Sequence, residues 1–279
     1  MRRLLLAAAA FAALVAAPGA FASTSDVLPQ HSANWAGYAV SDATTLSTGT
    51  TDPSQTAPLQ FTSVTATWKV PKVTCAADAS PAYSAFWVGL GGYSDGAQAL
   101  EQIGVDSDCT REAKPTYYAW YELVPAPSVH LTLQVQGGDT VTASVNVSGT
   151  DVLVQVKNRT RRSAFTRHLP MESPDLSSAE WIAEAPSACS SLGECHVLPL
   201  ADFGSVGFTR IATIANTHGG TLTDPTWSAA ALTLVPHKAG SPFFGVPGDA
   251  GKAGAAPAAF TADGRGFSVG WVADASALR

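Results

Sequence analysis

The sequence predicts an all-β fold, either a sandwich or a barrel. Many short runs rich in Val, Thr, Trp, Tyr and Phe are bounded by Gly, Pro, Asn and Asp, which is typical of such folds. No helical periodicity is sustained beyond the amino terminus, and "QGGDTV" at 136–141 predicts a hairpin turn. A single domain of about 250 residues is reasonable for this class.

The expected strands follow one another with turn residues between them. Alternating or β-branched runs justify strands at 34–40, 63–71, 85–92, 100–107, 117–125, 131–136, 140–149, 151–160, 162–170, 178–186, 203–214, 230–236 and 266–273. The segment 238–257, rich in Gly, Pro and Ala, predicts a long surface connection before the last strand.

The first 22 residues have the features of a secretory signal peptide. Arg2 and Arg3 precede an apolar run, and Ala20-Phe21-Ala22 forms a cleavage site, so we expect cleavage after Ala22. The run is shorter than the roughly 20 apolar residues that span a bilayer. We therefore expect a secreted, extracellular protein with no membrane contact after cleavage. Residues 23–33 form a short segment that could be a propeptide, and 34–279 form the domain.

Charge and the lack of metal-binding motifs narrow the possible partners of the protein. Only 14% of the residues are charged, and removal of the signal arginines leaves 14 basic against 22 acidic residues. A surface with this net charge of −8 does not attract nucleic acid. No zinc-binding motif occurs and the six histidines are scattered, so we expect no metal and no cofactor. We expect a monomer.

Four cysteines in an exported chain suggest two disulfides. Their spacing pairs them most simply as Cys75 with Cys109 and Cys189 with Cys195, although four cysteines allow three connectivities.

Period-two alternation assigns polar and aromatic side chains to one face of several strands. If these faces belong to one sheet, they line a polar and aromatic cleft suited to an extended polymer. The alternative is an ordinary solvated face, but large indoles are uncommon there. The residues that share such faces are Gln102 with Asp106, Trp120 with Glu122, and Glu180 with Glu184, and Trp87 alternates in the same way.

Six ordered blocks resemble the glutamic peptidase family, or eqolisins, in a form typical of bacterial members. They are "NWAGYAV", "FWVGLGG", "LEQIGVD", "YYAWYELVP", "SAEWIAEAP" and "LADFGSVGFT", and the resemblance covers most of the chain between Asn34 and Trp271. It implies a β-sandwich of two antiparallel sheets, similar in shape to concanavalin A-like lectins and jelly rolls. It also implies an endopeptidase that cleaves protein or peptide substrates in acid.

The resemblance also implies roles for individual residues. Gln102 and Glu184 match the catalytic pair. The matching residues that support the substrate are Trp35, Trp87, Asp106, Trp120 and Glu122.

Two positions depart from the fungal pattern. Gly91 stands where an aspartate is usual, and Asp95 is the nearby candidate to replace that carboxylate. Glu101 stands where an apolar residue is usual, and it should point away from the cleft towards a partner that the sequence does not identify.

The chemistry of peptide hydrolysis explains why a strand would carry an amide at Gln102. Glu184 can take a proton from the attacking water, and the Gln102 amide can stabilise the oxyanion without titrating. An unperturbed glutamate has a pKa of about 4.3, which predicts an activity maximum between about pH 2 and pH 5.

Two other function classes fit parts of the sequence. "GYSDG" satisfies the G-x-S-x-G pattern, so Ser94 is a candidate serine nucleophile, although no helix is predicted after it. A lectin-like glycan-binding module or a glycoside hydrolase is the other alternative, with Glu122 and Glu184 as a carboxyl pair across strands.

Overall fold

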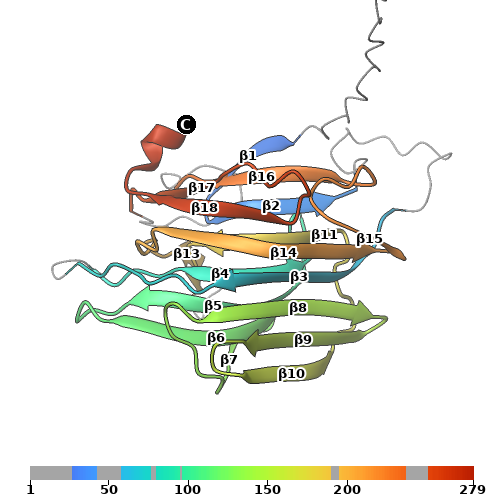
Figure 1. Ribbon diagram of the computed structural model, residues 1–279, viewed down its shortest axis with the longest axis horizontal. Coiled ribbons are helices and arrows are strands. Elements are labelled where there is room, and N and C mark those ends of the chain that lie inside the picture. The colour runs from blue at the N-terminus through green and yellow to red at the C-terminus, as the bar shows by residue number, and fades with distance from the viewer. Residues whose placement is uncertain (1–26, 43–57, 77–79, 95, 190–194, 237–250) are drawn as a thin grey trace, which may run out of the picture.

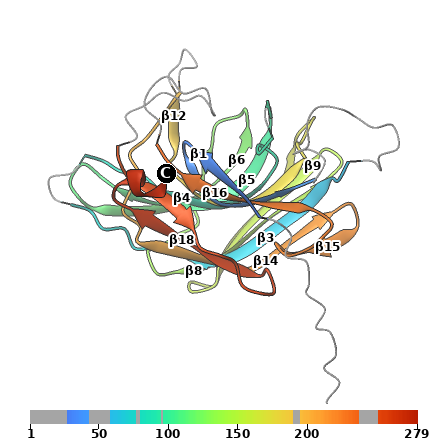
Figure 2. The same ribbon diagram turned by 90° about the horizontal axis from the view of Figure 1, so that it is seen from above.

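The computed structural model describes residues 27–42, 58–76, 80–94, 96–189, 195–236 and 251–279. Its strands form two stacked layers, seen face-on in Figure 1 and from above in Figure 2. All strand pairs are antiparallel except β1 (Leu28–Ser32) with β16 (Ser228–Leu234), which is parallel. The predicted sandwich of antiparallel sheets is confirmed.

The hydrogen-bonded order runs continuously through both layers. The layer in front in Figure 1 contains β10 (Ser163–Pro170), β9 (Asp151–Asn158), β8 (Thr140–Ser148), β3 (Phe61–Lys69), β14 (Ser205–Ala215), β18 (Gly266–Val272) and β17 (Gly254–Pro257). The path continues through β16, β2 (Trp35–Ser41), β11 (Ser178–Glu184), β4 (Ala85–Leu90), β5 (Leu100–Cys109), β6 (Pro115–Val124) and β7 (Val129–His130). The smaller elements are β15 (His218–Gly220), which pairs with β14, the β12 (Ser187–Cys189) and β13 (Cys195–Val197) hairpin, and a 3-10 helix at Ala275–Leu278.

The core lies between the layers and is filled by alternate residues of each strand. In β8 and β9 the buried residues are mostly valines, including Val141, Val145 and Val154, and they belong to the same cluster as Phe86 and Val88 of β4. Burying each such side chain stabilises the fold by about 1.5 to 3 kcal/mol. The alternation predicted from sequence therefore determines which face of each strand points inward.

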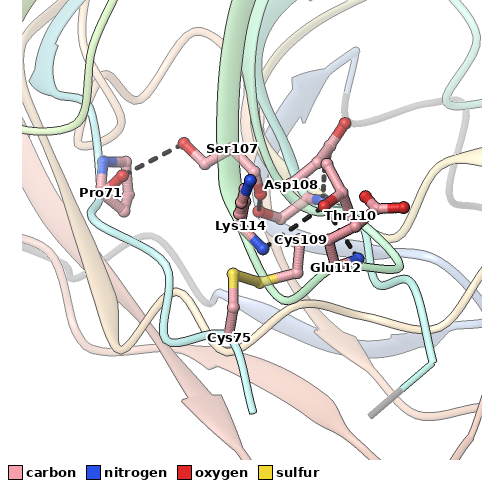
Figure 3. Close-up of a disulfide and its surroundings, with 9 residues drawn as sticks. Pro71, Cys75, Ser107, Asp108, Cys109, Thr110, Glu112 and Lys114 are labelled. Carbon is pink, nitrogen blue, oxygen red and sulfur yellow. Dashed lines mark hydrogen bonds between the residues drawn. A yellow bond between two sulfur atoms is a disulfide. The ribbon is translucent and has the colours of Figure 1, made fainter. Parts of the chain in front are cut away.

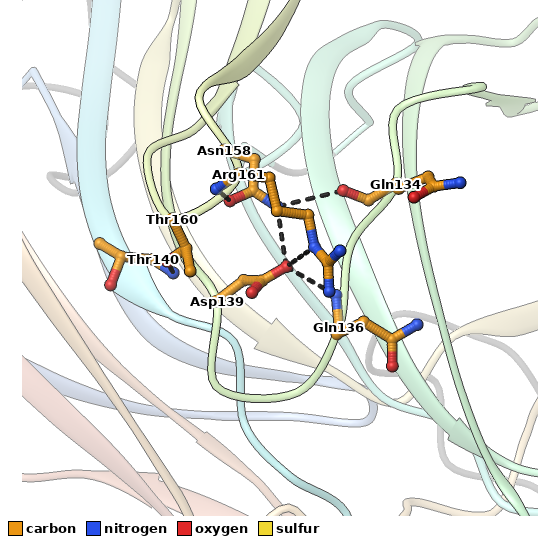
Figure 4. A network of polar contacts seen from close by, with 7 residues as sticks. All are labelled: Gln134, Gln136, Asp139, Thr140, Asn158, Thr160 and Arg161. Carbon is orange, nitrogen blue, oxygen red and sulfur yellow. Dashed lines mark hydrogen bonds and ion pairs between the residues drawn. The ribbon is translucent and has the colours of Figure 1, made fainter.

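The strand expected at 131–136 is wrong. Leu131 still donates to Ala119 O of β6 at 2.8 Å, but side chains bind the backbone at Gln134 and Gln136 (Figure 4). Asn158 Nδ2 donates to Gln134 O at 3.1 Å, and Asp139 Oδ2 accepts from the backbone N–H of Gln136 at 3.0 Å. Arg161 Nε also donates to Asp139 Oδ2, at 2.6 Å. The segment runs from β7 to β8, which lie in different layers. These hydrogen bonds satisfy backbone groups that would otherwise need a neighbouring strand.

Several short segments outside the predicted strands also form strands, and two of them, β1 and β17, extend the main sheet. Residues 28–32 of the expected N-terminal segment form β1, in which Leu28 pairs with Ala230 and Ser32 with Leu234. Residues 254–257 of the expected surface connection form β17, which pairs with β18 and contacts β16. The segment 1–22, predicted to be a signal peptide, lies outside the described residues. No helix within the described ranges has the length and apolar character needed to cross a membrane.

Both predicted disulfides are confirmed. Cys75 bonds to Cys109 and joins the segment after β3 to the end of β5 (Figure 3). Cys189 bonds to Cys195 and closes the β12–β13 hairpin. Neither bridge has a free cysteine competing with it in the described part of the chain.

Removing the longer bridge is expected to destabilise the protein more than removing the shorter one. The bridges close segments with sequence separations of 34 and 6 residues. Loop-closure entropy then predicts losses of about 4 and about 2 kcal/mol respectively. Denaturant unfolding of the two paired Cys→Ser variants at acidic pH measures both losses, and equal losses would contradict this ranking.

Candidate active site

Adjacent strands of the second layer bring the predicted catalytic residues to one face of a sheet. Residues that pair directly across strands share a face. Glu184 of β11 pairs with Ala85 of β4, which pairs with Asp106 of β5. On the same face Gln102 of β5 pairs with Glu122 of β6. The opposite face of β5 carries core residues such as Ile103, so the polar face points outward.

A cavity of about 610 Å³ opens on this face. It contains five of the seven residues predicted for the site and has no Lys, Arg or His in its lining. The β12 strand, which stands out from the layer in Figure 2, contributes to one side of the cavity. The lining residues are Gln102, Asp106, Trp120, Glu122 and Glu184, with Ala85, 124–128, Pro186, Ser187 and Cys189.

Glu184 lies at the end of β11 with a donor on each carboxyl oxygen. Asn34 Nδ2 donates to Oε1 at 2.9 Å, and Trp87 Nε1 donates to Oε2 at 2.7 Å. Burial, reinforced by the charge of Glu122, raises the pKa of Glu184 to about 7 although these donors favour the ionised form. The carboxyl is therefore fixed in orientation and holds its proton more tightly than a free glutamate.

Gln102 is buried and is oriented by Glu122. Its Nε2 donates to Glu122 Oε2 at 2.7 Å, while its Oε1 is buried and has no partner in the protein. Burial raises the pKa of Glu122, and the Gln102 hydrogen bond partly opposes that rise. The second N–H of Gln102 Nε2 can therefore donate to a ligand, whereas the carbonyl oxygen is enclosed by the protein.

Asp106 is held by two aromatic residues of β6. Trp120 Nε1 donates to Asp106 Oδ1, and the Tyr118 hydroxyl donates to Oδ2 at 2.7 Å. The same hydroxyl lies 3.1 Å from Asp108 Oδ2. Burial, followed by the charges of Asp108 and then Glu184, raises the pKa of Asp106 well above its usual value. Trp120 and Asp106 thus form one rigid unit of the cavity.

The two remaining predicted residues, Trp35 and Trp87, lie next to Glu184 rather than in the cavity lining. Trp87 is fully buried, so it contacts Glu184 rather than the open cavity. Trp35 is partly exposed and packs edge-on against Trp87, with ring centroids 5.0 Å apart. Both indoles interact with the Glu184 carboxyl and favour its ionised form.

Sequence reasoning missed two residues that touch the site. Tyr118 shares the face of Trp120 and Glu122 by simple alternation, so that pattern would have found it. Asn34 is the first residue of the "NWAGYAV" block, but it precedes β2 and no periodicity indicates its direction.

The structure identifies the surroundings of the two unusual positions. Glu101 points away from the cavity and accepts a hydrogen bond from the backbone N–H of Asp175 at 3.1 Å. Asp175 Oδ2 accepts from the N–H of Gly92 at 3.0 Å, and a Cβ at Gly91 would lie 2.4 Å from Asp175 Cβ. A side chain at position 91 is therefore excluded by Asp175. Asp95, the candidate from sequence, lies outside the described residues.

The serine candidate has a different environment from a hydrolase nucleophile. The Ser94 hydroxyl lies 3.3 Å from the hydroxyl of Ser177, whereas a triad serine contacts a histidine. Ser94 does not line the cavity that contains Gln102 and Glu184. Within the described ranges, no group of three or more His, Cys, Asp or Glu residues is arranged to hold a metal ion.

Solved structures share this fold. The chain aligns with scytalido-glutamic peptidase bound to a transition state analog inhibitor at a TM-score of 0.63 and 23% identity, covering 86% of this chain and 98% of that one. SCP-B, described as a member of the Eqolisin family, aligns at a TM-score of 0.57 and 22% identity with the same coverage. No curated protein was found to match the chain in sequence.

The family is shown by sequence over most of the chain. Residues 33–235 match the model of the Peptidase A4 family. This segment contains Gln102, Glu184 and the strands that carry them. The chain therefore belongs to the Peptidase A4 family, the glutamic peptidases or eqolisins, and is a glutamic endopeptidase.

Proposed function

We propose that this endopeptidase hydrolyses peptide bonds with Gln102 and Glu184 as its catalytic pair. The observation that carries the proposal is the arrangement of the two side chains around one cavity. Glu184 is fixed by donors on both oxygens, and Glu122 holds the Gln102 amide through one N–H and leaves its second N–H to donate. The pair therefore offers a proton acceptor and an uncharged hydrogen-bonding group to the same substrate.

The reaction then runs in two proton transfers. Glu184 takes a proton from water while the water oxygen attacks the peptide carbonyl carbon. The free N–H of Gln102 donates to the oxyanion that forms, and Glu122 holds the amide in place through the other N–H. Glu184 then gives its proton to the amide nitrogen, and the C–N bond breaks to release an amine and an acid.

The cavity suits an extended peptide as substrate. Trp120 and the segment 124–128 supply apolar surface, and Asp106, Glu122 and Gln102 supply polar contacts. SCP-B, which shares the fold, was solved in complex with the tripeptide Ala-Ile-His. These features, together with two disulfides, support a secreted enzyme that acts on proteins outside the cell.

The acid limb of activity is expected at the upper end of the acid range. A general base must be ionised, and the pKa of Glu184 is raised to about 7 by burial and by the charge of Glu122. Below that pH most molecules carry a protonated Glu184, which cannot take a proton from water. We therefore expect kcat/KM to rise with pH up to about 7, above the range that an unperturbed glutamate predicts.

Digestion of a denatured protein from pH 2 to pH 8 tests both the function and the pH dependence. Cleavage that resists a serine-blocking reagent supports the Gln102 and Glu184 pair. A maximum near pH 2 would contradict a base as buried as Glu184. Loss of cleavage with the serine reagent would favour Ser94, and hydrolysis of polysaccharides instead of protein would favour a glycoside hydrolase.

A further inference from the structure

Asn34 is the polar neighbour of Glu184 that has no place in the proposed reaction. Its Nδ2 donates to Oε1 of the carboxyl, whereas Trp87 holds Oε2 from another strand. Two donors on different oxygens prevent the carboxyl from rotating. The backbone of Asn34 is fixed as well, because its carbonyl accepts from the N–H of Ala185, next to Glu184, at 2.8 Å.

The amide of Asn34 is oriented by Ser32. The Ser32 hydroxyl lies 3.4 Å from Asn34 Oδ1, to which it donates, and it accepts from the backbone N–H of Trp35 at 3.0 Å. With its oxygen facing Ser32, the amide presents its nitrogen to Glu184. The reverse orientation would place an oxygen against the ionised carboxylate.

Ser32 in turn is part of the sheet. It is the last residue of β1, is largely buried, and its carbonyl accepts from the N–H of Val235 at 2.9 Å. The β1 strand pairs with β16 along its whole length. A connected series of contacts therefore leads from the N-terminal strand to the carboxyl of Glu184.

We propose that Asn34 is a positioning residue that holds the Glu184 carboxyl in the orientation needed to take a proton from water. Ser32, at the end of β1, holds Asn34 in place. This inference rests on the proposed role of Glu184 as general base. An amide suits the task because it donates at every pH, whereas a charged donor would also change the charge of the cavity. It follows that N-terminal processing that removed β1 would disturb the catalytic carboxyl.

The main test is the pH dependence of Asn34→Ala. Loss of a hydrogen bond to a charged group is expected to lower kcat on the order of 10- to 100-fold, with KM nearly unchanged. Loss of a donor to the ionised carboxylate also raises the pKa of Glu184, so the acid limb of kcat/KM should move to higher pH. A purely structural role would not move that limb.

Asn146→Ala provides a matched control. Asn146 is also an asparagine bonded to a serine, since it accepts from the hydroxyl of Ser63 at 2.8 Å, but it lies in the other layer on β8. Its substitution should leave kcat and the pH profile unchanged. Thermal unfolding of both variants separates lost stability from lost positioning.

Asn34→Asp supplies a second readout, because aspartate has nearly the size of asparagine and leaves no void in the packing. When protonated, the new carboxyl can donate to Glu184, and when ionised it repels Glu184. Activity relative to the wild type should therefore be highest at the acid end and fall as pH rises. Ser32→Ala should show a smaller loss than Asn34→Ala, with a limb shift in the same direction.

Two results would overturn the inference. One is an unchanged kcat and acid limb in Asn34→Ala, and the other is a loss that matches the fall in stability without any shift of the limb. Glu184→Gln, assayed in parallel, separates the two levels of proposal. If Glu184→Gln is inactive and Asn34→Ala is normal, only the positioning role fails. If Glu184→Gln is active, the base assignment fails and the positioning role fails with it.

Discussion

Glu184→Gln is expected to lower kcat by at least about 10² to 10³ while the protein stays folded. Glutamine has the size of glutamate and keeps an oxygen that can accept from Asn34 or Trp87, but it cannot take a proton from water. Gln102→Ala should cost on the order of 10² to 10³ in kcat, by analogy with the loss of one oxyanion donor. Both effects are measured as kcat and KM on a peptide substrate, with thermal unfolding as the check on folding.

The two substitutions should not be additive. Without the base, stabilisation of the oxyanion has little to act on, so the double variant should resemble the more severe single variant. Additive losses would mean that the two side chains act independently.

Suitable carboxyl controls come from the structure rather than from the sequence pattern. Glu180 shares a strand and a face with Glu184, but it is fully buried, so Glu180→Gln tests stability as well as activity. Glu112 is exposed and lies outside the cavity, which makes Glu112→Gln the cleaner control. An active Glu184→Gln beside an inactive Glu122→Gln would show that Glu122 is the base.

Alternation predicted much of the fold because the side-chain period of a strand is independent of its partners. It found the long strands such as β8 and β9, whose buried valines alternate with more exposed residues, and β5, whose apolar and polar side chains alternate along the sequence. It predicted a strand at 131–136 for the same reason, although side chains bind that backbone. It missed β1 and β17, which are short and contain Pro, Gly or Ala. Such segments become strands only because a neighbour supplies the hydrogen bonds.

The residues of the site likewise divide into those that alternation within one strand could predict and those that it could not. Gln102 and Asp106, and likewise Trp120 and Glu122, could be assigned to a common face because each pair lies within one strand. The approach of β11 to β4 and β5 joins residues about 80 positions apart, and only the family resemblance related them. The hydrogen bond from Asn34 to Glu184 spans 150 residues and begins outside a strand, so no local pattern encodes it.

Two buried carboxyls outside the proposed catalytic pair are expected to make the fold less stable as pH rises. Glu101 and Glu180 are both 0% exposed. Glu101 accepts a hydrogen bond from the backbone N–H of Asp175. Neither oxygen of Glu180 has a donor in good hydrogen-bond geometry, although the nearby Ser178 hydroxyl partly opposes the rise in its pKa. No ion pair to either carboxyl occurs among the residues that the structure describes. Ionising them therefore places uncompensated charge in the interior.

The direction of the effect follows from the pKa values. Burial raises the pKa of Glu101 from 4.5 to about 8, with the charge of Asp175 adding to the rise, and burial raises the pKa of Glu180 well above 4.5. Between those two pH values the folded protein binds more protons than the unfolded chain, so stability falls as pH rises. The stability that the protonated Glu101 contributes is fully present below about pH 4.5 and is lost as pH passes about 8. Since each pKa unit corresponds to about 1.4 kcal/mol, the loss should reach several kcal/mol.

Denaturant unfolding of the wild type, Glu101→Gln and Glu180→Gln between pH 4 and pH 9 measures this dependence directly. The neutral amides mimic the protonated carboxyls, so each variant should match the wild type most closely at pH 4 and exceed its stability at pH 8. Glu112→Gln, which removes an exposed carboxyl, should follow the wild-type curve. If the variants lose stability in parallel with the wild type, the destabilising charge lies elsewhere, and Asp106 is then the next residue to replace because its pKa is also raised well above the usual value. Its hydrogen bonds to Trp120 and Tyr118 mean that Asp106→Asn would alter the cavity as well, so only the Glu101 and Glu180 variants separate pH stability from catalysis.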